Sequence, residues 1–340
     1  MNPIVSICIA NYNGIDFIDA CIESVQAQDC RFAYEIIVHD DASMDGSAAH
    51  IRTHHPDVRL IESSDNVGFC IANNRMAEVA GGEYFLLLNN DAALETDALQ
   101  TLYAEATHLD RPAILGLAQY DSDSGKLLDI GSLLDPFLNP VPNTNAQRSD
   151  VGMVMGACFW IPKVLWKTLG GFPEWFGSIA EDLYLCCAAR LTGFPVRALG
   201  NSGFNHQVGR SFGGGKVTTG GRLVTTMNRR ALTERNKTFT LVITYPAALL
   251  AIVLPLHLAA LHLEGLLLTL LTLQSEIWRK IYAPVLPSLW HERQRLLWQR
   301  RHLQRRRSST VREFLAPFRW LPRKLEMLWL HGFPEVRAKK

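Results

Sequence analysis

Two amides and a carboxylate end one of the most apolar stretches of the chain. Residues 84–91 read Y-F-L-L-L-N-N-D, so five apolar residues in a row stop at Asn89, Asn90 and Asp91. An apolar run without alternation is typical of a buried parallel strand that helices cover on both faces. Open α/β sheets bind ligands at the carboxyl ends of such strands, and a carboxylate there suits a divalent cation that carries phosphate oxygens. An ordinary Asn/Asp turn after a strand is the alternative interpretation.

Polar residues also end two earlier apolar runs. One run ends at Ala10 and is followed by Asn11 and Tyr12, and another is followed by Asp40 and Asp41. Because the carboxyl ends of parallel strands meet at one edge of a sheet, we expect these side chains and Asp91 to gather there. No G-x-G-x-x-G follows the first run, which argues against a dinucleotide-dependent dehydrogenase.

Strand and helix patterns alternate between these runs. Strands are expected at residues 5–10, 35–38, 58–61 and 84–88, and helices at residues 16–26, 47–51, 71–80 and from residue 96. A strand–helix repeat of this kind predicts a parallel sheet with right-handed crossovers, which is a doubly wound α/β domain.

Two further candidates follow a stretch without periodicity. We expect a hairpin and a mobile loop at residues 121–150, then a strand at 153–161, a helix at 163–169 and a strand at 195–199. Asp182 lies in the first turn of the next predicted helix, where an acidic residue is common without any catalytic role. His206 begins a predicted flexible loop that runs through Gly213–Gly215, so an ordinary loop histidine is its alternative interpretation.

The last third of the chain has a different composition. Leu241–Leu273 is almost wholly apolar and contains one charged residue, Glu264, but prolines and histidines interrupt it, so neither half is expected to be a clean membrane span. Arg279–Arg312 then carries ten Lys and Arg residues against Glu292, with Trp290 and Trp298 among them and Trp278 just before. This mixture favours a helix in the headgroup region of an anionic membrane. The alternatives are a transmembrane span, a buried helical hairpin with a solvated basic face, and an RNA-binding tail.

Composition narrows the class of protein further. The 340 residues are 48% hydrophobic with a net charge of +1, which suggests two domains and gives no support for nucleic acid as a partner. The seven cysteines form no C-x-x-C pair and are odd in number, so we expect reduced core residues in a cytosolic compartment. The first ten residues have no basic region and enter a strand directly, so no signal peptide is expected.

Seven motifs together resemble a known family. They are V-S-I-C-I-A-N-Y-N-G (5–14), H-D-D-A-S-M-D-G-S (39–47), N-V-G-F-C-I-A-N-N (66–74), L-L-L-N-N-D (86–91), G-G-F-P-E-W-F (170–176), E-D-L-Y-L (181–185) and H-Q-V-G-R-S (206–211). In order and spacing they resemble an inverting family 2 glycosyltransferase, and more narrowly its bacterial rhamnosyltransferase-like branch. The resemblance implies a GT-A fold, α/β with a mostly parallel, Rossmann-like sheet, over residues 1–235. Residues 236–340 would form a C-terminal helical region that associates with a membrane.

The resemblance also assigns residues to the nucleotide-sugar donor. Asp40 would hydrogen-bond the pyrimidine base, with Asp41 beside it, and Ala10 and Tyr12 would flank that base. Three amides complete the expected donor site. Asn73 and Asn74 would lie near the ribose or diphosphate, and Asn90 would also contact the nucleotide.

The metal and the catalytic base are assigned in the same way. Asp91 matches the last residue of the family's D-x-D element and would bind Mg²⁺ or Mn²⁺, with His206 completing the site. Asn89 stands where the strict motif has its first Asp, which leaves one anionic ligand fewer. Asp182 matches the family's base. The four side chains of Asp40, Asp91, Asp182 and His206 should therefore surround one cleft.

The implied function is sugar transfer from a nucleoside diphosphate. The partners would be a nucleotide-sugar donor, a saccharide or lipid-linked acceptor and a membrane surface, with a homodimer as one form of assembly and no nucleic acid. The expected location is the cytoplasmic face of the bacterial inner membrane. dTDP-rhamnose is the donor that the resemblance suggests, and a UDP-sugar is the alternative. A non-catalytic nucleotide-binding module, or an integral membrane protein with a cytosolic cap, would be a different class of protein.

Overall fold

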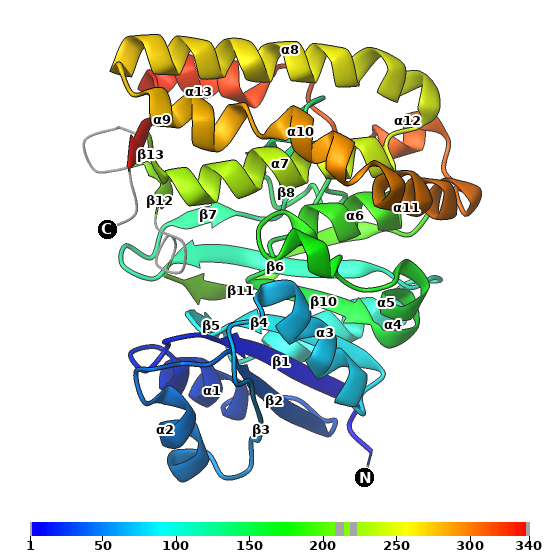
Figure 1. Ribbon diagram of the computed structural model, residues 1–340. Helices are drawn as coiled ribbons and strands as arrows, with labels where there is room; N and C mark the ends of the chain where they lie inside the picture. The colour runs from blue at the N-terminus through cyan, green and yellow to red at the C-terminus, as the bar shows by residue number, and fades with distance from the viewer. Residues whose placement is uncertain (1, 208–213, 218–222, 338–340) are drawn as a thin grey trace. The chain divides into compact units, whose positions relative to one another are not determined.

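Figure 1 shows the computed structural model, which describes residues 2–207, 214–217 and 223–337. The chain divides into two compact units. The first, here called the sheet unit, comprises the residues up to Ser132, Pro142–Ala189 and Phe194–Gln207. The second, here called the helical unit, comprises Leu133–Val141, Arg190–Gly193 and the chain from Val208 onwards. The boundary expected from the sequence at residues 235 and 236 falls inside a helix, Met227–Thr244.

The sheet unit is built on a nine-stranded sheet. The strands lie in the order β3-β2-β1-β4-β10-β6-β11-β5, and β7 pairs with β6. Their bounds are β1 Val5–Asn11, β2 Tyr34–Asp40, β3 Arg59–Glu62, β4 Tyr84–Asn89, β5 Ala92–Leu94, β6 Ile114–Asp121, β7 Leu127–Asp129, β10 Cys158–Pro162 and β11 Val196–His206. The helices are α1 Ile18–Gln26, α2 Ser47–His54, α3 Phe69–Val79, α4 Ala98–His108, α5 Lys163–Leu169, the 3₁₀ turn η1 Glu174–Phe176, and α6 Glu181–Leu191.

The first four strands of the chain form the parallel half of this sheet. β1 pairs with β2 and β4 in parallel, and β2 pairs with β3 in parallel. Residues 5 and 7–9 of β1 and residues 85–88 of β4 are fully or almost fully buried, as the unbroken apolar runs predict. Helix α1 buries Ile18, Cys21, Ile22 and Val25 on one face, in the spacing that the sequence predicts. The doubly wound α/β prediction is therefore confirmed for this half.

Residues 121–150 contain strand β7, which pairs antiparallel with β6, and the paired strands β8 Ser132–Leu134 and β9 Pro140–Pro142, so the hairpin expected there is present. Two predictions about the second half of the sheet are wrong. The strand expected at residues 153–161 covers only Cys158–Pro162. Strand β11 continues to His206, because a register shift between Leu199 and Gly203 keeps it beside β6. A Cβ at Gly203 would lie 2.9 Å from the Ala118 carbonyl oxygen, so only glycine permits this approach.

The helical unit contains a second, small sheet and most of the remaining helices. Its strands β12 Gly214–Val217, β13 Leu223–Thr226 and β14 Glu335–Arg337 lie in that order. Gly214 therefore begins a strand, although a loop was predicted at Gly213–Gly215, and Gly213 lies outside the described residues. The helices are α7 Met227–Thr244, α8 Ala247–Thr272, α9 Ser275–Ile277, the π-helical turn η2 Trp278–Tyr282, α10 Val285–His291, α11 Arg293–Arg305, α12 Val311–Phe314 and α13 Arg323–His331.

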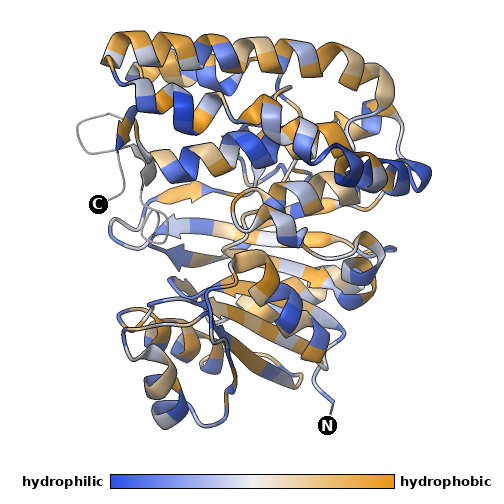
Figure 2. Cartoon of the chain, viewed as in Figure 1, coloured by the Kyte–Doolittle hydropathy of each residue, from blue (hydrophilic) through white to orange (hydrophobic). Residues whose placement is uncertain are grey.

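Helix α7 is the central element of this unit, since it contacts α8, α10, α11 and η2. Helix α8 is continuous over 26 residues despite Pro255, which corrects the expectation of an interrupted apolar segment. By length and composition it is the one described helix that could cross a membrane. Figure 2 shows α8 as an almost unbroken apolar helix and α11 as a strongly polar one.

Candidate active site

A chain of hydrogen bonds joins the carboxyl ends of three parallel strands. Asn90, which follows β4, donates its amide to Asn11 Oδ1 at 2.7 Å. Asn11, at the end of β1, donates in turn to Asp40 Oδ1 at 2.7 Å and to Ser47 Oγ at 2.9 Å. Asp40 ends β2 and is buried. The polar residues that follow the three apolar runs therefore lie together at one edge of the sheet, here called the carboxyl edge.

Tight turns hold this edge in place. Asn13 has a left-handed backbone with φ 48°, and its N–H donates to Ser43 Oγ at 2.9 Å. Ala42, in the neighbouring loop, has φ 59°. Non-glycine residues rarely adopt this conformation, and they keep it only where surrounding contacts enforce it. A Cβ at Gly14 would lie 2.1 Å from the Asn90 amide nitrogen, so the first loop requires glycine beside the hydrogen-bond chain.

Asp91 and His206 meet directly at the carboxyl edge. Strand β5 begins one residue after Asp91 and pairs with β11, which brings His206 Nε2 to 3.1 Å from Asp91 Oδ1. The other ring nitrogen, Nδ1, lies 2.9 Å from the Gln119 amide of β6. Both members of the pair are buried, and a carboxylate and an imidazole are ligands that Mg²⁺ or Mn²⁺ accepts. A hydrogen-bond partner on the second nitrogen is also the usual way in which a metal-binding histidine is oriented.

Asp182 is attached to the same edge through the segment before β10. Gly156 donates its N–H to Asp182 Oδ2 at 2.9 Å, and Leu183 donates its N–H to Oδ1 at 2.7 Å. The next residue of that segment, Ala157, accepts a hydrogen bond of 3.1 Å from Asn89 at the end of β4. These bonds bring the predicted base to the strand end that precedes Asp91.

The turn before Asp182 adopts an unusual backbone. Ile179 and Ala180 have φ values of 71° and 69°, and a β-branched residue is an outlier in this region. Burial raises the pKa of the Cys70 thiol in α3, and the neighbouring carboxylates of Glu181 and Asp182 raise it further. Cys70 also donates its N–H to Gly177 O at 3.0 Å, so the start of α3 supports the turn that positions Asp182.

The residues predicted to bind the donor differ in their exposure and in the hydrogen bonds that they already make. Tyr12 is 53% exposed, whereas Asp40 is almost fully buried. Asp40 accepts three hydrogen bonds, from Asn11 and from the N–H and hydroxyl of Ser43. A carboxylate offers about four acceptor positions, so one remains for a ligand. Ala10 lies one residue before Asn11 and is partly buried.

Asp41, Asn73 and Asn74 hold the loops together. Asp41 accepts the N–H groups of Val67 and Gly68 at 2.7 and 2.9 Å, ahead of α3. The Asn73 amide donates to the Phe69 carbonyl within α3 at 2.9 Å, and Asn74 exchanges two hydrogen bonds with the backbone of Phe172. Contact of any of these three with the donor stays a prediction.

The sequence analysis placed Asn11 at this edge without giving it a role, and it did not identify Gln119 or Gly156. The hydrogen bonds to Asp40 and from Asn90 now give Asn11 a role, because it connects the ends of two other strands. Gln119 gave a weak signal, as one buried amide in the apolar strand β6. Gly156 gave none, since only its backbone acts. Arg210 and Ser211 of the expected metal-site motif lie outside the described residues.

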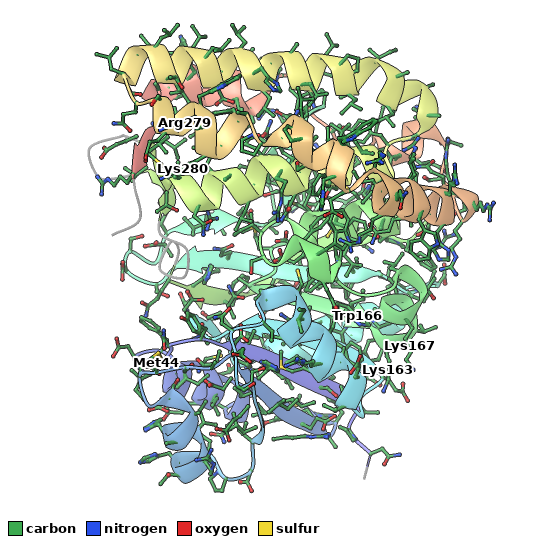
Figure 3. The ribbon with its side chains drawn as sticks, in the orientation of Figure 1. Met44, Lys163, Trp166, Lys167, Arg279 and Lys280 are labelled. Atoms are coloured by element: carbon green, nitrogen blue, oxygen red, sulfur yellow. The ribbon has the colours of Figure 1, made fainter. Side chains whose placement is uncertain are left out.

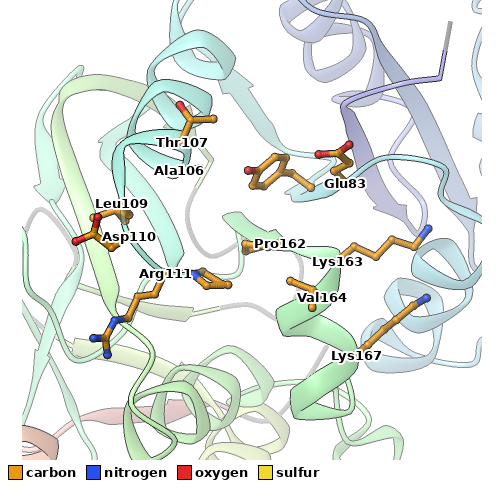
Figure 4. Close-up of a pocket in the computed structure, with 12 residues that line it drawn as sticks. Glu83, Ala106, Thr107, Leu109, Asp110, Arg111, Pro162, Lys163, Val164 and Lys167 are labelled. Atoms are coloured by element: carbon orange, nitrogen blue, oxygen red, sulfur yellow. The ribbon is translucent and has the colours of Figure 1, made fainter.

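Two other features of the sheet unit involve none of these side chains. Asp19, His50 and His55 form a group within hydrogen-bonding distance, with both histidine Nε2 atoms 2.8–2.9 Å from Asp19 Oδ1. A pocket of about 820 Å³ opens at the opposite, amino end of β4 and is shown in Figure 4. Its lining includes Glu83, Arg111 and Lys163, and none of the site residues named above.

The fold resembles that of solved nucleotide-sugar enzymes. The structure of S. aureus TarS residues 1–349 in complex with UDP matches with a TM-score of 0.53 at 14% identity, covering 88% of this chain and 90% of that one. The mannosyltransferase PcManGT from Pyrobaculum calidifontis in complex with GDP-Man and Mn²⁺ matches with a TM-score of 0.52 at 17% identity, covering 89% and 87%. The sheet order and these matches define a GT-A fold.

The sequence comparisons specify the family. The model of "Glycosyl transferase family 2" matches residues 6–169. Glycosyltransferase GlyG of Streptococcus pneumoniae is 26% identical over 129 residues, which are 37% of this chain and 42% of the relative. The N-acetylglucosaminyl-diphospho-decaprenol L-rhamnosyltransferase of Mycobacterium tuberculosis is 25% identical over 180 residues, which are 44% of this chain and 59% of the relative. Residues 6–169, just under half of the chain, therefore match glycosyl transferase family 2, and the chain covers less than two thirds of the length of these relatives.

Proposed function

We propose that the protein is an inverting, divalent-metal-dependent glycosyltransferase that moves a sugar from a nucleoside diphosphate to a saccharide acceptor. The observation that supports it best is that Asp91, His206 and Asp182 belong to one edge of a family 2 sheet unit. This arrangement gives a metal-ligand pair and a separate buried carboxylate, which are the two groups that the reaction needs.

Asp182 acts as the general base in this proposal. The acceptor hydroxyl gives its proton to an Asp182 oxygen while its own oxygen attacks the anomeric carbon. The bond from that carbon to the diphosphate breaks, and the nucleoside diphosphate leaves from the opposite face with the electron pair. The N–H groups of Gly156 and Leu183 orient the carboxylate.

Asp91 and His206 would hold Mg²⁺ or Mn²⁺, and a bound cation would offset the charge that develops on the leaving diphosphate. For this to happen, His206 must present an unprotonated Nε2. In the structure the amide nitrogen of Gln119 faces Nδ1 of His206. With the amide rotated by 180°, its oxygen accepts the Nδ1 proton, and Nε2 is then the unprotonated nitrogen that can bind the metal. Gln119 is therefore a positioning residue.

The proposed donor is dTDP-rhamnose, with a UDP-sugar as the alternative. The rhamnosyltransferase relative supports the first at 25% identity. In either case Asp40 would hydrogen-bond the base and Asp41 would hold the loops around it. Tyr12, the most exposed of the predicted residues, would flank the base. Ala10, Asn73, Asn74 and Asn90 complete the proposed donor site.

The proposed acceptor is a lipid-linked saccharide, which the protein would meet at the cytoplasmic face of a bacterial membrane. The apolar α8 supports this location, together with the relative that acts on a decaprenol-linked sugar. A panel of nucleotide sugars, incubated with undecaprenyl-linked acceptors and Mg²⁺ or Mn²⁺, tests both substrates. We expect metal-dependent transfer from one deoxythymidine donor. Donor binding with neither transfer nor donor hydrolysis would instead identify a non-catalytic binding module.

A further inference from the structure

Helix α8 has its polarity reversed relative to a surface helix of a soluble protein. Every exposed residue from Ala247 to Leu271 is apolar. The exposed leucines recur three and four residues apart, at positions 256, 263, 266, 267, 270 and 271. The ionisable side chains of α8, which are His257, His262 and Glu264, are buried or partly buried. A surface helix normally faces water with its polar side, so this helix is built for a non-aqueous neighbour.

The inner face of α8 is fixed by buried ion pairs. Glu264 contacts Arg230 of α7 in a short ion pair, and it accepts a 2.6 Å contact from Lys324 of α13. Lys324 also lies 2.5 Å from Glu234, which in turn lies 2.8 Å from Lys237. These five residues, here called the ion cluster, connect α7, α8 and α13. Glu234 and Lys237 are almost fully buried, and charges at that depth depend on their partners, because a lost partner leaves an uncompensated charge.

Close packing holds the same face in place. Leu261 and Leu268 lie in an apolar cluster with Ile281 and Tyr282 of η2. A Cβ at Gly265 would lie 2.5 Å from the Tyr282 ring, so η2 approaches the α8 backbone directly. Helix α8 is therefore attached, through Glu264 and through its packing on η2, to neighbours that carry charges. If it crossed a bilayer in this arrangement, the charged residues of α7 and α13 would enter the hydrocarbon as well, which is strongly unfavourable.

Helix α13 and the adjoining segments add exposed aromatic residues. Trp329 and Leu325 of α13 are exposed, and so are Trp320 just before it and Trp290 and Trp298 of α10 and α11. Tryptophan is enriched where hydrocarbon meets headgroups. The stick view in Figure 3 shows Arg279 and Lys280 on η2, next to α8, and exposed basic residues continue through α11. Arg300 is an exception, because it donates to the carbonyls of Val242 and Tyr245 at the end of α7.

We propose that α8 lies in the plane of the membrane, with its outer face in the hydrocarbon of one leaflet, α13 beside it and the basic residues among anionic headgroups. The protein is then monotopic and does not span the bilayer. This position of α8 rests on the proposed function in one respect, which is that a lipid-linked acceptor would be located at a membrane. A second copy of the chain fits the surface less well, because interfaces between proteins are depleted in lysine, whereas the exposed Lys280 and further basic residues adjoin the apolar face. An anionic lipid leaflet accommodates an apolar face and adjoining basic residues together.

Flotation with vesicles of phosphatidylglycerol and phosphatidylethanolamine tests lipid binding without donor or acceptor. The full chain should float with these vesicles, and the double variant Leu263→Glu, Leu267→Glu should lose roughly tenfold or more of the bound fraction. Val164→Glu is the matched control, because Val164 on α5 is 62% exposed and Leu263 is 59% exposed. Arg301→Gln with Arg305→Gln should weaken binding less, and only at low salt.

Cysteines at the two ends of α8 test its orientation. Ala247→Cys and Leu273→Cys should both react with a membrane-impermeant maleimide from the same side of sealed vesicles, measured against the wild-type background. Labelling from opposite sides would establish a span and overturn the proposal. So would a failure to float, or a dimer that forms through this face and dissociates in the Leu263→Glu, Leu267→Glu variant. Transfer to a soluble acceptor reports the proposed function separately, since it does not require vesicles.

Discussion

The two units each bury a polar network, but they build it from different side chains. At the carboxyl edge of the sheet unit, short amides and carboxylates at strand ends join through hydrogen bonds of 2.7–3.1 Å. In the ion cluster of the helical unit, long charged side chains from three helices form salt bridges. The first network lies where a nucleotide would bind, and the second holds helices together beneath an apolar surface. We therefore assign the buried polar groups of the sheet unit to the proposed active site, and those of the helical unit to the attachment of helices to one another.

Position in the fold distinguishes a proposed catalytic network from a structural one better than charge does. The carboxyl edge is surrounded by backbone in the left-handed region, at Asn13, Ala42, Ile179 and Ala180. No residue of the ion cluster, within the described part of the helical unit, has such a backbone, because a regular helix holds each one. Strained loops are characteristic of functional sites. Substitutions at the two networks should accordingly affect activity in one case and stability in the other.

Replacement of the proposed base should have the largest effect on activity. Asp182→Asn keeps an oxygen for the Gly156 N–H but cannot accept a proton, so the transfer rate should fall by about 10²–10⁴-fold. Thermal stability should change little. The measurement is steady-state transfer with the donor identified in the panel. Asp19→Asn, the same substitution in a carboxylate of α1, is the control and should retain activity. Wild-type transfer by Asp182→Asn would remove Asp182 from the mechanism.

Removal of a charge from the ion cluster should have the opposite profile. Glu234 is almost fully buried against Lys237 and Lys324, so Glu234→Gln should lower the free energy of unfolding by roughly 3–5 kcal/mol. Denaturant unfolding measures that free energy. Since the proposed donor site lies in the sheet unit, the variant should still bind donor wherever that unit is folded. Glu276→Gln removes a carboxylate from an exposed pair with Lys280, and should cost under about 0.5 kcal/mol. Equal effects of the two variants would contradict a structural role for the cluster.

The sequence was sufficient for the first network and insufficient for the second. Asn11, Asp40 and Asn90 each follow an unbroken apolar run, and parallel strands must bring such ends together. The partners of Glu264 lie 34 and 60 residues away along the chain. Helical periodicity shows which face a residue occupies but not which helix it meets, so the ion cluster could not be anticipated. The continuity of α8 was missed for a related reason, since Pro255 ends a helix in isolation but not in one held by its neighbours.

Gln119 permits a sharper test of the catalytic network. Gln119→Leu removes the partner of His206 Nδ1 and leaves Asp91 and His206 in place. Because that hydrogen bond sets the tautomer, we expect the affinity for Mn²⁺ to fall by about 10–100-fold, while donor binding without metal is unchanged. Titration calorimetry with MnCl₂ measures this directly, independently of turnover. Gln119→Glu should restore much of the affinity, since a carboxylate also accepts the Nδ1 proton. Unchanged affinity in both variants would exclude a positioning role.

The smallest of the expected effects is a difference between the two units in how their stability depends on pH. His257 of α8 is 3% exposed, and burial, together with the nearby charge of Lys237, lowers its pKa to about 3. In the unfolded chain the imidazole takes up a proton below about pH 6.5, whereas the folded chain resists it. The unfolded state therefore binds more protons, and stability should fall by somewhat over 1 kcal/mol per pH unit below that point.

His257→Gln should flatten this dependence between about pH 6 and pH 4 in thermal unfolding scans, although it loses some stability at neutral pH. Below about pH 4.5 a further slope should come from carboxylates with a lowered pKa, among them Glu234, Asp19 and Asp45. Burial works to raise the pKa of Glu234, but Lys237 and Lys324 hold that pKa well below the usual range. As the carboxylate is charged only above its folded pKa, its stabilisation is lost as the pH falls further. His291→Gln, at an exposed histidine of α10, is the control and should leave the curve unchanged. A curve unaltered by His257→Gln would mean that acid first unfolds the sheet unit.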